Sequence, residues 1–82
     1  MGTGKKICRI IADITKRDVK EIDVKLSFEV LEVDSMLFIQ VLVACEVEFE
    51  IEFGDDMLYI ERFSSIEAFI EYVDEIINKI SG

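Results

Sequence analysis

The chain has 82 residues, 18 acidic and 9 basic side chains, a net charge of −9, and no His, Pro or Trp. Its hydrophobic content of 51% is enough for a folded core, so we expect one domain over residues 1–82 and not a disordered acidic segment. Without His, Ser–His and Cys–His nucleophile pairs are excluded within the chain. Two cysteines, Cys8 and Cys45, are too few for a zinc site, and we expect no bound metal.

The charge is distributed unevenly. Residues 1–33 carry seven basic and six acidic side chains, whereas residues 34–82 carry two basic and twelve acidic ones. An acidic body of this kind repels phosphates, so nucleic acid is not an expected partner. The apolar runs are too short to span a bilayer and no secretion signal is evident, so we expect a cytoplasmic protein without membrane insertion, with both cysteines as free thiols.

Helices are expected near both ends of the chain. Ile7, Ile10, Ile11 and Ile14 lie on one stripe of a helix with 3.6 residues per turn. Near the other end, Ser64-x-x-Glu67 has the spacing of a capping box. The apolar stripe that follows it consists of Ile66, Phe69, Ile70, Val73, Ile77 and Ile80.

The middle of the chain allows two folds. Asp34 is a good N-cap for a helix running from Ser35 to Glu48, and Met57 to Phe63 predicts one or two irregular helical turns. Residues 24–30 and 47–53, however, alternate apolar and polar side chains as half-buried strands do. Periodicity therefore leaves open an α+β domain and a helical bundle with a long first loop.

A motif around Ser35 favours the bundle. The sequence Leu31-Glu32-Val33-Asp34-Ser35-Met36 resembles the Leu-Gly-x-Asp-Ser-Leu/Met signature of acyl and peptidyl carrier proteins. Further matching stretches follow the family order: Ser27-Phe28, Glu46-Val47-Glu48-Phe49-Glu50-Ile51, Gly54-Asp55-Asp56-Met57-Leu58 and the run from Ser65 to Val73. The resemblance implies an all-α four-helix bundle with a long first loop and a short third helix.

The resemblance also implies a function that involves no catalysis by the chain itself. In this family the serine matched by Ser35 carries 4′-phosphopantetheine, which a phosphopantetheinyl transferase takes from coenzyme A with Mg²⁺, and Asp34 is expected near that metal. The arm holds acyl or aminoacyl units as thioesters for acyltransferases, synthases or ligases, in lipid, polyketide or related biosynthesis. We expect a monomer in which the acyl chain is sheltered by Ile11, Leu42, Phe49, Phe69 and Val73.

Two departures from the family pattern concern the surroundings of Ser35. Glu32 replaces the usual Gly, and it is strained if the backbone there needs a positive φ. No carboxylate lies between Asp34 and Glu46, where fatty-acid carriers usually place acidic docking residues. We therefore expect partners to meet a mainly apolar surface, formed by Met36, Leu37, Gln40, Val43 and Val47.

Two alternatives to the carrier hypothesis remain from the sequence. One is a carrier-like domain that binds partners without being modified. The other is an unrelated small α+β binding domain, which the two alternating segments permit.

Overall fold

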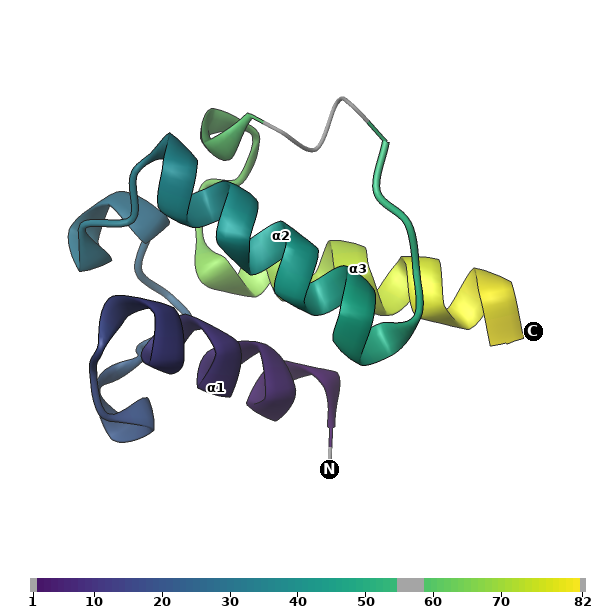
Figure 1. Ribbon diagram of the computed structural model, residues 1–82, viewed down its shortest axis with the longest axis horizontal. Helices are drawn as coiled ribbons and strands as arrows, with labels where there is room; N and C mark the ends of the chain where they lie inside the picture. The colour runs from purple at the N-terminus through teal and green to yellow at the C-terminus, as the bar shows by residue number, and fades with distance from the viewer. Residues whose placement is uncertain (1, 55–58, 82) are drawn as a thin grey trace.

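The computed structural model describes residues 2–54 and 59–81, and these are all-helical (Figure 1). They form three α-helices: α1 (Thr3–Thr15), α2 (Ser35–Phe49) and α3 (Ile66–Ser81). Three short 3-10 helices lie between them: η1 (Val19–Glu21), η2 (Phe28–Leu31) and η4 (Ile60–Arg62). Because the described residues contain no strand, the α+β alternative is wrong.

The helical class expected from the family resemblance is confirmed, whereas the count of four helices is not. In the region of the expected short third helix, the described residues form only the 3-10 helix η4. The acidic turn at Asp55 and Asp56 and the beginning of the Met57–Phe63 stretch lie outside the described residues.

The two alternating segments are not strands, for different reasons. In the first, the carbonyls of Val24 and Leu26 accept hydrogen bonds from the Glu67 and Ile66 amides of α3, at 2.8 and 2.9 Å. This loop thus satisfies amides that the first turn of a helix leaves unpaired. The second segment contains the end of α2, where Glu50 adopts a left-handed conformation with φ of 55°, followed by irregular chain.

The first turn of α3 is capped differently from the expected capping box. Ser65, and not Ser64, provides the cap, because its Oγ accepts a hydrogen bond of 3.1 Å from the Ala68 amide. The helix therefore begins one residue later than the Ser64-x-x-Glu67 spacing predicts. The predicted cap was therefore wrong by a single position.

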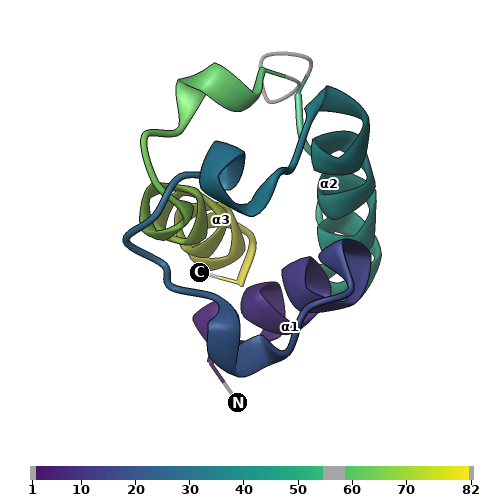
Figure 2. The same cartoon turned by 90° about the vertical axis from the view of Figure 1, so that its left-hand side faces the viewer.

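Phenylalanines from four elements or their flanking residues join the helices at the core. Phe28 of η2 makes edge-to-face contacts with Phe38 of α2 and Phe69 of α3, with ring centroids 5.2 and 5.5 Å apart. Phe63, just after η4, also packs on Phe69. α1 packs directly on both α2 and α3. Figure 2 shows η2 in the space between α2 and α3, so the long first loop completes the bundle.

Candidate functional site

Ser35 is the first residue of α2, and side chains of the residues just before it are buried in the core. Leu31 and Val33 are buried on either side of the exposed Glu32. The Val33 amide donates to the Phe28 carbonyl at 3.1 Å, which closes the turn at the end of η2. This anchoring fixes the position of Ser35 while leaving the residue itself exposed.

Glu32 occupies the backbone conformation that glycine prefers. Its φ is 62° and its ψ is 30°, in the left-handed region, and its amide donates to the Glu29 carbonyl at 3.0 Å. The positive φ on which the expected strain depends is therefore present. A left-handed conformation costs a residue with a Cβ roughly 1–2 kcal/mol, and the tight turn before Ser35 requires it here.

Asp34 is the N-cap of α2, as the sequence predicts. One carboxylate oxygen accepts a hydrogen bond of 2.9 Å from the Leu37 amide, and the Asp34 carbonyl accepts another of 2.8 Å from Phe38. No acidic residue lies in the first turn of the helix. Asp34 thus orients the first turn, and the positive end of the helix dipole is located at Ser35.

This geometry fits a phosphodiester on Ser35. The Ser35 side chain is exposed, and it forms no hydrogen bond within the part of the chain that the structure describes. A phosphate there faces backbone amides at the beginning of a 15-residue helix, which is a favourable place for an anion. Among the described residues no group of three or more Cys, Asp or Glu side chains is arranged to hold a metal ion.

The outward face of α2 is apolar and accessible. Met36, Gln40, Val43 and Val47 recur at intervals of four, three and four residues, which places them on one stripe of the helix. Met36 and Val47 are 74% and 75% exposed, and Val43 is 53% exposed. Leu37 lies beside the stripe and is only partly exposed, since it also packs against the core. Ile39, which was not among the expected surface residues, is also exposed on this helix.

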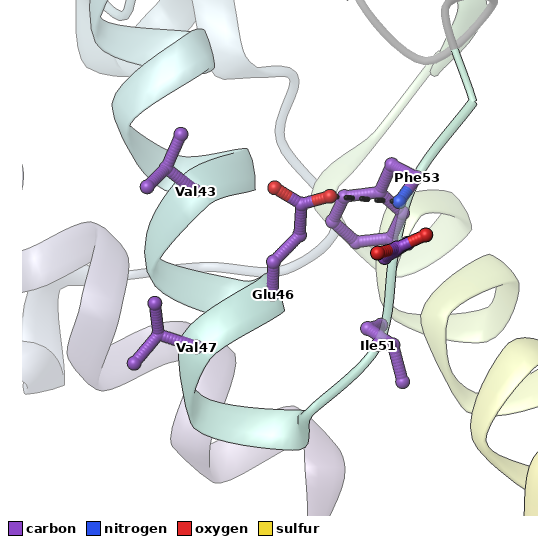
Figure 3. Close-up of a pocket in the computed structure, with 6 residues that line it drawn as sticks. Val43, Glu46, Val47, Ile51 and Phe53 are labelled. Carbon is purple, nitrogen blue, oxygen red and sulfur yellow. Dashed lines mark hydrogen bonds between the residues drawn. The ribbon is translucent and has the colours of Figure 1, made fainter.

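A shallow groove lies beside the C-terminal half of α2, with a volume of about 330 Å³. Its lining consists of Val43, Glu46, Val47, Ile51, Glu52 and Phe53. Figure 3 shows Glu46 pointing from α2 toward Phe53, whose amide donates a hydrogen bond of 2.8 Å to the Glu46 carboxylate. In this view Val43 and Val47 of α2 lie to the left of Glu46, and Ile51 and Phe53 lie to its right. The Glu46 side chain therefore connects α2 by a hydrogen bond to the segment that follows the helix.

The five residues expected to shelter an acyl chain lie in the core or against it. Ile11, Leu42, Phe69 and Val73 are buried, and Phe49 packs against them while remaining partly exposed. The groove beside α2 and the pocket beside α1 described below are lined by none of the five. The lining of an acyl cavity therefore stays a prediction.

A comparison with known protein families agrees with the resemblance found around Ser35. The family model described as "Phosphopantetheine attachment site" matches residues 5–73, which is most of the chain. The chain therefore belongs to this family of phosphopantetheine-binding domains, and the resemblance to acyl and peptidyl carrier proteins is confirmed. Domains of this family are generally carriers and not catalysts. No helix among the described residues is long and apolar enough to cross a membrane.

Proposed function

We propose that this protein is a carrier that holds biosynthetic intermediates on a 4′-phosphopantetheine arm attached to Ser35. The observation that carries the proposal is the exposed Ser35 side chain at the beginning of α2, in a chain of the phosphopantetheine attachment family. The arm supplies a terminal thiol on which an acyl or aminoacyl group is held as a thioester. The chain itself supplies the anchored serine, the favourable helix end and the surface that partners recognise.

Attachment is a substitution at phosphorus that a phosphopantetheinyl transferase performs. Ser35 Oγ attacks the phosphorus next to the pantetheine of coenzyme A and loses its proton to a base of the transferase. The phosphoanhydride bond breaks, and the adenosine bisphosphate half of coenzyme A leaves. Asp34 uses one oxygen to cap α2. We propose that its other oxygen contacts the Mg²⁺ that neutralises the phosphates during this step.

An intact-mass measurement tests the attachment. The unmodified protein is incubated with coenzyme A, Mg²⁺ and a broad-specificity phosphopantetheinyl transferase. We expect a gain of one phosphopantetheine unit, which Ser35→Ala abolishes and Ser64→Ala does not. Ser64 is the matched control because it is also exposed but lies outside the motif. Failure to gain mass with several transferases would favour an unmodified interaction domain.

We further propose that the apolar stripe of α2 is where partner enzymes dock. The proposed surface consists of Met36, Leu37, Gln40, Val43 and Val47. It rests on their accessibility and on the lack of carboxylates between Asp34 and Glu46. Burial of apolar side chains gives affinity that depends little on salt, whereas charge steering accelerates association and is weakened by salt.

The salt dependence of association distinguishes these two modes. We expect the association rate with the transferase to fall only slightly as salt is raised. Val47→Glu, which places a carboxylate on the stripe, should make that dependence steeper and slow binding at high salt. Val30→Glu is the matched control, because Val30 is 57% exposed but belongs to η2. A steep salt dependence of the unaltered protein would contradict the apolar docking surface.

The cargo belongs to lipid, polyketide or related biosynthesis in this proposal, and the protein acts as a cytoplasmic monomer. Its partners are then an acyltransferase, synthase or ligase that loads or elongates the thioester. We propose that the acyl chain enters the core beside Ile11, Leu42, Phe49, Phe69 and Val73. Loading the arm with an acyl group should shift the NMR signals of the Ile11 and Val73 methyl groups, while an unloaded arm should not.

A further inference from the structure

A second pocket lies on the first helix, in the basic part of the chain, to which the carrier function gives no role. Its volume is about 480 Å³. The lining residues are Gly4, Lys5, Cys8 and Arg9 of α1, Val19 of η1 and Val24 of the first loop. The size falls within the range of small-molecule sites in proteins. In Figure 1, α1 begins at the bottom of the molecule, whereas α2, which carries Ser35, begins at the upper left.

The charge of this pocket is opposite to that of the whole chain. Lys5 and Arg9 line it and, among the described residues, no carboxylate does, although the chain carries twice as many acidic as basic side chains. The two cations are four residues apart on α1, so they lie on neighbouring turns of one helix face. The groove beside α2 has the reverse character, since Glu46 and Glu52 are its charged lining residues. A ligand of the α1 pocket should therefore be an anion.

The rest of the lining is apolar. Val19 is 41% exposed, an accessible apolar side chain beside the two cations. Val24 and Cys8 are partly buried and pack against the core. Burial raises the pKa of the Cys8 thiol, so at neutral pH it is an uncharged, weakly polar group. An ion without an apolar part would leave these side chains uncovered.

We propose that this pocket binds a small organic anion with an apolar body, of which an alkyl carboxylate is the simplest example. The carboxylate pairs with Lys5 and Arg9 at the surface. The alkyl part covers Val19, Val24 and Cys8. Binding at this pocket does not require the arm on Ser35, so the two proposals stand or fall separately.

Protection of Cys8 from a thiol reagent tests this binding, with octanoate as the probe. The Ser35→Ala variant is used, because it carries no arm thiol. Cys45 is fully buried and reacts only when the protein opens, so it reports any loss of folding. The dissociation constant is first measured from the chemical shifts of Val19 and Val24. At about twice that concentration, octanoate should slow Cys8 modification about threefold, the factor expected from occupancy.

Two comparisons decide whether the pocket recognises the anion. Lys5→Gln/Arg9→Gln should abolish the protection, while Lys25→Gln/Lys79→Gln, the same charge change at exposed positions outside the pocket, should leave it intact. Octanol has the same apolar length without the charge and should protect weakly or not at all. The proposal is overturned if octanol protects Cys8 as well as octanoate does, or if protection survives in the Lys5→Gln/Arg9→Gln variant. It is also overturned if octanoate leaves the chemical shifts of Val19 and Val24 unchanged.

Discussion

The two faces of α2 carry similar side chains in opposite surroundings. Phe38, Val41, Leu42 and Cys45 are buried and hold the helix in the bundle. Met36, Val43 and Val47 face outward and are accessible, although burying them would have been favourable. α1 and α3, in contrast, direct most of their charged side chains to solvent. The outward face of α2 is therefore not explained by folding, and we propose that partners dock on it beside Ser35.

The most direct test of this comparison makes the same change on each face of α2. Val41→Ala removes two buried methyl groups from the core and should destabilise the protein by about 2 kcal/mol. Val43→Ala, at a position 53% exposed, should change stability by less than about 0.5 kcal/mol. Urea denaturation of the two variants measures both values. Equal losses would mean that the outward face also contributes to the core.

The burial of Cys45 on the inner face of α2 can be tested through the pH dependence of stability. Burial, together with the carboxylates of Glu46 and Glu48, raises the pKa of Cys45 from 9.0 to about 12. The thiol ionises at lower pH in the unfolded chain than in the folded one. The contribution of Cys45 to the free energy of unfolding is therefore fully present below pH 9 and is lost as the pH rises toward 12. The loss should be at most about 1.4 kcal/mol per pH unit.

The Cys45→Ala variant isolates this effect from other groups that titrate in alkali. Its stability should fall less steeply above pH 9 than that of the unaltered protein, whatever its absolute stability. Chemical denaturation at a series of pH values gives the two slopes. Identical slopes would show that Cys45 is not protected from ionisation by the fold.

A smaller effect is expected at the turn that delivers the chain to α2. Glu32→Gly should stabilise the protein by roughly 0.5–1 kcal/mol, because relief of the left-handed conformation outweighs the greater freedom of Gly in the unfolded chain. Glu29→Gly is the control, since Glu29 lies in η2, which ends just before Glu32, and has no positive φ, so that this variant should be less stable. A loss of stability in Glu32→Gly would contradict the strain at this turn.

The sequence predicted the region around Ser35 better than it predicted residues 24–30. The sequence around Ser35 predicted the start of α2 and the Asp34 cap, because local hydrogen bonding determines both. Its resemblance to carrier proteins predicted the family. Periodicity failed at residues 24–30 because the chain turns into η2 at Phe28, so that Phe28 is buried whereas Val30 is 57% exposed, and the alternation of the sequence is not an alternation of burial. The carbonyls that pair with α3 come from a contact 40 or more residues away along the chain, which no local pattern encodes.

The pocket on α1 shows a further limit. The sequence shows that seven of the nine basic side chains lie in the first 33 residues, but it could not show that Lys5 and Arg9 line one pocket with Val19 and Val24. That arrangement depends on how η1 packs on α1, which is a tertiary contact. The outward stripe of α2 was easier to predict, because its members lie on one helix and their spacing alone places them together.

The measurement that tests the central claim most directly is the location of the modification. After treatment with coenzyme A, Mg²⁺ and the transferase, the protein is digested and the peptides are sequenced by tandem mass spectrometry. The account predicts that all of the phosphopantetheine is on Ser35, next to the Asp34 cap. Attachment to any other residue, or an unmodified Ser35 after treatment with transferases that load other carriers, would contradict it.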